Sequence, residues 1–176
     1  MILEILKYPD PFLKTKAGPV EAVDDGIRKL IDDMVETMYH AKGIGLASVQ
    51  VGVDKRVVVL DVPDEDDRER VKGKNLLALV NPEIIYKEGV TTFEEGCLSV
   101  PGFTADVERA SVLKVKALDR NGSPVEIEAG GLLAIAIQHE IDHIDGFLFI
   151  DRLSRIKKEM MKRKIKKALE AEEKAL

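Results

Sequence analysis

Apolar residues recur with a period of about 3.6 residues over positions 23–40, as they do in a helix that buries one face. The apolar stripe consists of Ile27, Leu30, Ile31, Met34, Val35 and Met38. Asp24 and Asp25 lie near the expected start of the helix, where carboxylates favour the helix dipole, and Ala41-Lys42-Gly43 is expected to end it. The pattern predicts an amphipathic N-terminal helix.

The middle of the chain has the patterns of β-strands. The expected strands are residues 56–61, 76–80, 84–86, 112–118 and 125–129. A charged loop at 64–74 precedes the second strand, and Asn81-Pro82 separates the second from the third. The fourth strand alternates apolar residues with Lys114 and Lys116, as a half-exposed strand does. Asp119-Arg120-Asn121-Gly122 then predicts a hairpin turn.

Two more helices follow the strands. Residues 132–144 form a helical pattern that opens after Gly130-Gly131 and ends at Gly146. Because this segment is apolar almost all round up to Gln138, we expect it to run through the core. A last, charged helix is expected at about 154–173. Its packing stripe is expected to be Leu153, Ile156, Met160, Ile165 and Leu169. The order of elements predicts an α+β fold, with antiparallel β-sheets around a central second helix and helices at both termini.

Composition narrows the class of protein. The chain has 176 residues, 45% apolar and 34% charged, which suits one domain over 1–176 with a basic C-terminal helix at 154–176. A net charge of −5 argues against a nucleic-acid binder as a whole and leaves a local basic segment possible. Glu4 and Lys7 break the N-terminal apolar run, and no stretch approaches the roughly 20 residues that span a bilayer. With the single cysteine Cys97, a cytoplasmic protein without membrane contact is expected.

The central helix carries the segment Gln138-His139-Glu140-Ile141-Asp142-His143, which contains an HExxH motif. On a helix His139 and His143 stack on one face and can present two imidazole nitrogens to one cation. Glu140 lies about 100° around the helix and can reach a water bound to that cation without being a ligand. Polar residues in so apolar a helix also need partners. The motif predicts a metal-dependent hydrolase.

A catalytic metal site of this kind needs a third protein ligand and one open position. The metzincin motif would place a histidine where this chain has Phe149. Thermolysin-like enzymes place a glutamate about twenty residues after the second histidine, where this chain has Lys162-Arg163-Lys164. Cys97 is the remaining soft ligand. A lone cysteine is by default a small buried hydrophobe, but a thiolate with two imidazoles fits zinc or Fe(II).

Three separated segments stand in a specific order: Gly43-Ile44-Gly45-Leu46-Ala47-Ser48-Val49-Gln50, Glu95-Gly96-Cys97-Leu98-Ser99, and residues 138–143. Together they resemble the peptide deformylase family, whose members remove the formyl group from the initiator methionine of new bacterial proteins. Their order and spacing extend the match over nearly the whole chain. One departure is Ser48, at a position usually occupied by alanine, whose hydroxyl needs a hydrogen bond if it is buried.

The resemblance implies the chemistry of the site. Cys97, His139 and His143 would hold one divalent metal, with water in the fourth position. Glu140 would take the proton of that water and return it to the departing amine as formate is released. Fe(II) is the implied native ion, and zinc, nickel or cobalt could occupy the site in purified protein. A thiolate-ligated Fe(II) site would be oxygen-sensitive, which fits a reducing cytosol.

Further roles follow from the same resemblance. The side-chain amide of Gln50 and the backbone N–H of Leu98 would bind the developing oxyanion. The alternative for Gln50 is a loop amide that caps nearby backbone. Asp142 is expected to pair with Arg109 and brace the site, with a solvent-exposed Asp142 as the alternative.

Substrate contacts are also implied. An extended peptide could pair through its main chain with Ile44, Gly45 and Gly96, which would make recognition beyond the first residue loose. The pocket for the methionine side chain would be lined by Ile44, Phe93, Leu132, Ile135 and Ala136. Ordinary core packing remains the alternative for Leu132 and Ile135.

The last helix is dense in cations. They are Arg155, Lys157, Lys158, Lys162, Arg163, Lys164, Lys166 and Lys167. Such a run is usually a solvated face. Because a deformylase must meet N-formylmethionyl nascent peptides, contact of this helix with ribosomal RNA phosphates is our hypothesis, and a monomer is expected.

Two other functions remain open from the sequence. A peptidase could use the same metal and glutamate, although both standard positions for a third ligand are missing. A non-catalytic metal-binding or ribosome-associated module would have no need of an oxyanion hole or a general base.

Overall fold

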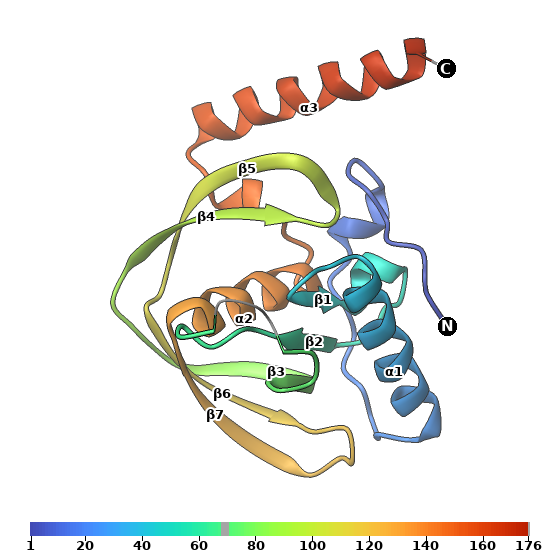
Figure 1. Cartoon of the computed structure of the whole chain (residues 1–176), viewed down its shortest axis with the longest axis vertical. Coiled ribbons are helices and arrows are strands. Elements are labelled where there is room, and N and C mark those ends of the chain that lie inside the picture. The colour runs from blue at the N-terminus through green and yellow to red at the C-terminus, as the bar shows by residue number, and fades with distance from the viewer. Residues whose placement is uncertain (68–70, 176) are drawn as a thin grey trace.

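Two antiparallel sheets and three α-helices make up the residues that the computed structural model describes, 1–67 and 71–175 (Figure 1). The helices are α1 (Asp25–His40), α2 (Gly131–Ile144) and α3 (Arg155–Ala175). The strands are β1 (Gly45–Ala47), β2 (Val57–Asp61), β3 (Leu76–Glu88), β4 (Thr91–Cys97), β5 (Val100–Arg109), β6 (Val112–Leu118) and β7 (Pro124–Gly130). The predicted α+β fold with antiparallel sheets is confirmed.

Helix α2 lies between the two sheets (Figure 1). The larger sheet has the strand order β1-β2-β3-β6-β7, and the smaller one is the β4–β5 hairpin. Ile137, Ile141 and Ile144 of α2 share a core cluster with apolar side chains of the larger sheet. Ten of the fourteen residues of α2 are buried. The helix therefore runs through the core, as its nearly uniform apolar composition predicted.

Strand β2 is buried along its whole length because it has a helix on each side. Val58 and Leu60 belong to the core cluster around α2. Val57 and Val59 belong to a second cluster, which they form with the apolar stripe of α1. A strand covered on both faces needs apolar residues at every position, and this accounts for the uninterrupted apolar run in the sequence.

Strand β3 corrects one prediction, because it continues through the segment that was expected to divide it. Its pairing with β6 shifts register between Val80 and Glu83. Asn81 adopts a left-handed conformation there, with φ of 51°. Its side-chain amide accepts from the N–H of Val20 and donates to the carbonyl of Val20, both at 2.8 Å. The irregularity accommodates Pro82, which cannot donate a ladder hydrogen bond, so one bent strand replaces two short ones.

The residue pattern of the sequence predicted one of the two hairpins and missed the other. The predicted β6–β7 hairpin is confirmed, with Leu113 opposite Ala129. The β4–β5 hairpin was not anticipated. Glu95 and Arg109 point into the protein from these strands and are buried. Strands are usually recognised by alternating apolar residues, and charged residues at inward positions interrupt that alternation. The sequence pattern therefore did not predict these two strands.

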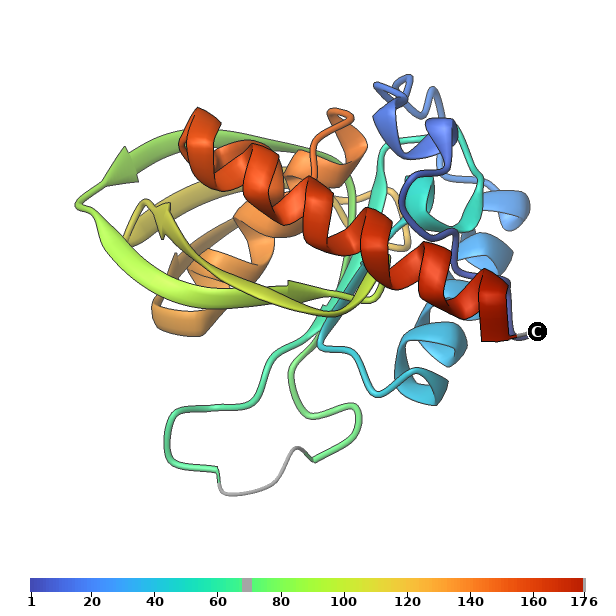
Figure 2. The same ribbon diagram turned by 90° about the horizontal axis from the view of Figure 1, so that it is seen from above.

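Helix α3 crosses the molecule beside the β4–β5 hairpin (Figure 2). Among its described residues Ile165 alone is fully buried, and Met161 and Leu169 pack beside it. The predicted packing stripe is therefore wrong for two residues, since Ile156 is 75% exposed and Met160 50% exposed. Met160 lies about 140° around the helix from Ile165, so one flat surface cannot cover both.

Candidate active site

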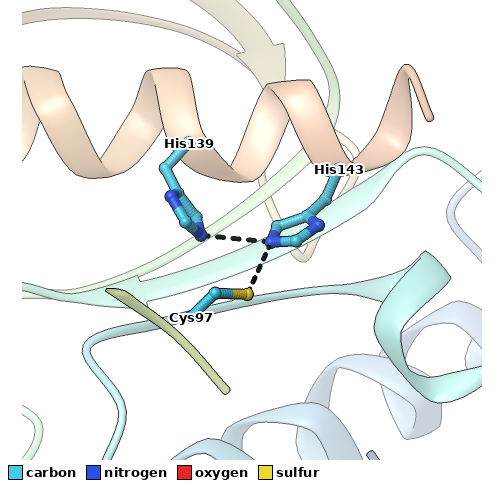
Figure 3. A group of neighbouring side chains, drawn as sticks. All are labelled: Cys97, His139 and His143. Carbon is cyan, nitrogen blue, oxygen red and sulfur yellow. Dashed lines mark hydrogen bonds between the residues drawn. The ribbon is translucent and has the colours of Figure 1, made fainter. Parts of the chain in front are cut away.

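Three side chains with metal-binding atoms converge where α2 faces the end of β4 (Figure 3). Cys97 is the last residue of β4, and its sulfur lies 3.3 Å from Nε2 of His143. Nε2 of His143 lies 3.1 Å from Nε2 of His139. The three donor atoms all lie within 4.8 Å of one another. The tertiary structure thus brings Cys97 to the two histidines, although more than forty positions separate them in the chain.

The separations of two of the three atom pairs fit one shared cation. A tetrahedral ion with bonds of about 2.0–2.3 Å would hold neighbouring nitrogen and sulfur ligands about 3.3–3.6 Å apart. The observed separations of 3.1 and 3.3 Å lie close to that range. The donor set of one thiol and two imidazoles is also one that zinc and Fe(II) favour. The residues present therefore suit a divalent metal.

Glu95 sets the orientation of the first histidine. Its Oε1 lies 2.9 Å from Nδ1 of His139, so the carboxylate accepts the Nδ1 proton and Nε2 is the ring nitrogen that faces His143. Arg109 donates two further hydrogen bonds of 2.8 Å to the same carboxylate. Burial alone would raise the pKa of Glu95, but the bonds to Arg109 and His139 outweigh it and hold that pKa below its usual value. Glu95 is therefore a charged acceptor that fixes the imidazole.

Asp142 lies behind the site, on the far side of Arg109. Its Oδ2 accepts a hydrogen bond of 2.5 Å from Nη1 of Arg109, which is the expected pair. Asp142 is 7% exposed, so the solvent-exposed alternative is wrong. Arg152 also donates to it, from Nε at 3.0 Å and from Nη2 at 2.6 Å.

Sequence reasoning had assigned no role to Glu95 or Arg152. Glu95 precedes Cys97 by two positions, so both side chains lie on the same face of a strand. Recognising β4 as a strand would have placed Glu95 in the site. Arg152 is the last residue of a short helical turn, Phe149–Arg152, and no local pattern of the sequence points to its partner.

Glu140 is buried beside the two histidines, with 2% of its surface exposed. Its Oε2 has no hydrogen-bond partner among the described residues. Burial raises the pKa of this carboxyl from 4.5 to about 7. A Cβ atom added at Gly45 would lie 2.8 Å from Oε2, so only glycine at that position leaves the carboxylate its place. An unpartnered buried carboxylate is costly, and it needs a proton or a ligand atom beside it.

Gln50 makes the local backbone cap that the sequence gave as one of its two alternatives, and its role toward an oxyanion stays a prediction. Its Oε1 accepts a hydrogen bond of 2.9 Å from the backbone N–H of Ala47, which is a local cap. That bond aims the amide nitrogen at Oγ of Ser99, 3.1 Å away, and at the sulfur of Cys97, 3.6 Å away. Ser48 is fully buried, and its hydroxyl donates to the carbonyl of Lys55, so the unusual serine has the partner it requires.

A cavity of about 390 Å³ opens onto these residues. Glu140, Gln50 and Leu98 line it together with Cys97 and His139. All seven residues expected to contact substrate also line it: Ile44, Gly45, Phe93, Gly96, Leu132, Ile135 and Ala136. Ile135 and Ala136 are each 6% exposed, while Phe93 at the mouth is 41% exposed. The cavity has the size and apolar lining of a small-molecule or side-chain pocket.

Known proteins match the chain over nearly its whole length. The family described as polypeptide deformylase matches residues 2–159. The peptide deformylase of Alkalilimnicola ehrlichii is 56% identical over 166 residues, which cover 94% of this chain and 90% of that one. The peptide deformylase of Chromobacterium violaceum is 54% identical over 166 residues, which cover 94% and 95%.

Solved structures agree with the sequence matches. The crystal structure of a peptide deformylase from Legionella pneumophila superposes with a TM-score of 0.87 at 46% identity and covers 98% of both chains. That of the peptide deformylase from Ehrlichia chaffeensis in complex with actinonin gives 0.86 at 42% identity, covering 95% of this chain and 97% of that one. No helix among the described residues is long and apolar enough to cross a membrane. Sequence and fold together show that this chain belongs to the polypeptide deformylase family of enzymes.

Proposed function

We propose that this protein removes the N-terminal formyl group from the initiator formyl-methionine of newly synthesised polypeptides and releases formate. The observation that carries the proposal is the convergence of Cys97, His139 and His143 beside an apolar cavity that Cys97 and His139 line. Family membership supports it, since the curated relatives are named peptide deformylase. In this reaction water adds to the formyl carbon, the C–N bond breaks, and the amine leaves with a proton.

Cys97, His139 and His143 are the proposed ligands of one divalent metal. A cation held by these donors acts as a Lewis acid and lowers the pKa of a water that it binds. We propose Fe(II) as the native ion, as the family resemblance implies, and zinc, nickel or cobalt as ions that purified protein can also carry. A thiolate with two imidazoles suits Fe(II) and zinc alike. Metal analysis of protein prepared without oxygen tests this choice.

Glu140 is the proposed acid–base residue. Its free Oε2 faces the space beside the proposed ligands, where it can take a proton from the attacking water. The same carboxyl then gives that proton to the departing amine nitrogen. Gly45 keeps this position open because it has no side chain.

Gln50 and Leu98 are the proposed partners of the oxyanion that develops on the formyl oxygen. The bond from Ala47 to Oε1 of Gln50 orients its amide, so the N–H₂ group points toward the site without reorganisation. The backbone N–H of Leu98, which follows the proposed ligand Cys97, supplies the second donor.

Substrate binding follows from the strand edges and the cavity. Strands β1 and β4 each pair on one side only among the described strands. An extended peptide can therefore add to them by main-chain hydrogen bonds at Ile44, Gly45 and Gly96. Its first side chain, that of methionine, would fill the apolar pocket formed by Ile44, Phe93, Leu132, Ile135 and Ala136.

Formate release from formyl-Met-Ala-Ser by anaerobically prepared protein tests the function. We expect turnover with the formyl peptide and none with the same peptide carrying a free or acetylated amino end. Cys97→Ala should lose both metal and turnover. Cleavage of unformylated peptides at internal bonds would instead indicate a peptidase, and retained metal in Cys97→Ala would overturn the ligand assignment.

We also propose that α3 contacts ribosomal RNA. Arg163, Lys164 and Lys167 are exposed on this helix, where they can reach phosphates. Replacing all three with glutamine should weaken co-sedimentation with ribosomes and reduce its salt dependence by about one unit of slope for each lost contact. Ribosome binding that is unchanged in this variant, or insensitive to salt, would contradict the proposal.

A further inference from the structure

A chain of alternating charges runs from the proposed metal site to the protein surface. Glu95 binds Nδ1 of His139 at 2.9 Å and accepts two bonds from Arg109. Arg109 in turn donates to Asp142, and Asp142 accepts two bonds from Arg152. The side chains of Glu95, Arg109 and Asp142 are all less than 10% exposed, whereas that of Arg152 is 46% exposed. Arg152 is therefore the outermost residue of this series of ion pairs.

The inner part of this chain is not electrically neutral by itself. Glu95 and Asp142 carry two negative charges, and Arg109 alone carries one positive charge between them. Burying an unbalanced charge is unfavourable, and the two carboxylates compete for the same guanidinium. Arg152 adds the second positive charge through two parallel N–H···O bonds, the strongest geometry of an ion pair.

We propose that Arg152 is a positioning residue for the metal site, acting through Asp142, Arg109 and Glu95 on His139. With Arg152 in place, Asp142 is satisfied from outside, and Arg109 keeps both of its bonds to Glu95. Glu95 then stays fixed against the Nδ1–H of His139. Without Arg152, Arg109 is the only arginine that donates to Asp142. The hydrogen bonds from Arg109 to Glu95 then weaken, and Glu95 holds His139 less firmly.

This inference rests on the proposed metal site and predicts an effect on metal retention. Groups that orient a metal-binding histidine typically change metal affinity or activity about 10–100-fold when they are altered. Because Arg152 acts through three intermediate side chains, we expect the lower end of that range. Arg152→Gln should release Co(II) or Ni(II) to a chelator about tenfold faster. Its kcat should fall while KM stays unchanged, because Arg152 does not line the cavity of the site.

Arg120, which lies outside this series of ion pairs, is a matched control. Its side chain is 44% exposed, and its guanidinium pairs with both oxygens of Asp32. Arg120→Gln should leave metal release unchanged. Arg152→Lys keeps the charge but cannot donate two parallel bonds, so it should accelerate release only about twofold to threefold, and Arg120→Lys should not accelerate it at all.

The decisive measurement is the rate of metal transfer from the loaded protein to an excess of chelator. Equal rates in Arg152→Gln and the unaltered protein would overturn the inference, as would equal acceleration by Arg152→Gln and Arg120→Gln. If Arg152→Gln does not fold, Arg152→Lys and Arg120→Lys are compared instead. Equal rates of metal release from these two variants would overturn the inference. In an Asp142→Asn background, Arg152→Gln should add nothing. Failure of the unaltered protein to bind metal would refute the proposed function instead.

Discussion

Helices α2 and α3 differ in how much of each is buried, and this difference separates the residues of the candidate site from those that meet solvent. Ten of fourteen residues of α2 are buried, against one of twenty-one in α3. The buried polar residues of α2 are Gln138, Glu140, Asp142 and His143. Where water cannot solvate a polar group, protein partners must hold it in one orientation. The charges of α3 lie mostly in solvent, so their positions are far less determined.

The largest predicted contrast concerns a glutamate on each helix. Glu140→Gln in α2 should lower formate release about 10²–10⁴-fold, because it removes the proposed proton carrier. Metal content should not change, since Glu140 is not a proposed ligand. Glu159→Gln in α3 is the control, and its exposed side chain should make it silent. Retained turnover in Glu140→Gln would contradict the mechanism.

The ion pairs that α2 and α3 make should also differ in how much each contributes to the free energy of unfolding. Arg109→Met leaves Glu95 and Asp142 without their shared partner, which should lower the free energy of unfolding by about 3–5 kcal/mol. Lys158→Met breaks the 2.7 Å ion pair between Lys158 of α3 and Asp151. The side chain of Lys158 is 30% exposed and that of Asp151 is 26% exposed. That loss should be about 0–1 kcal/mol. Urea unfolding measures both, and similar losses would remove the distinction between the helices.

A third test compares two isoleucines of α3. Ile165 is 3% exposed and Ile156 is 75% exposed. Ile165→Ala should cost about 2–5 kcal/mol of unfolding free energy, because it leaves a cavity beside the β4–β5 hairpin. Ile156→Ala should stay within about 0.5 kcal/mol. The opposite ranking would mean that α3 packs on the domain through Ile156 and not through Ile165, which would contradict the observed packing.

The smallest expected effect comes from one methyl group beside α2. Gly45→Ala would place a Cβ 2.8 Å from Oε2 of Glu140 and displace that carboxylate. Formate release should fall about 10–100-fold, with metal content unchanged. Gly18→Ala is the matched control, because its nearest neighbour would be 3.9 Å away. Equal activity in both variants would show that Glu140 tolerates the contact.

Sequence patterns predicted the elements whose chemistry is local. The stripe of α1, the continuous apolar run of β2 and the histidine spacing on α2 each follow from a short periodic pattern. The β4–β5 hairpin was missed because buried Glu95 and Arg109 interrupt its apolar face. The face on which α3 packs was predicted only in part, since it depends on where the hairpin lies.

The sequence by itself determined that two histidines and a glutamate share one helix, because residues four apart on a helix must lie on the same face. It also determined the candidate third ligand, through the three segments that resemble the family. Only the tertiary structure decided that Cys97 lies 3.3 Å from His143, and that Arg152 closes a chain of charges behind His139. Those contacts join distant parts of the chain. They depend on how the sheets and helices pack, which no local pattern encodes.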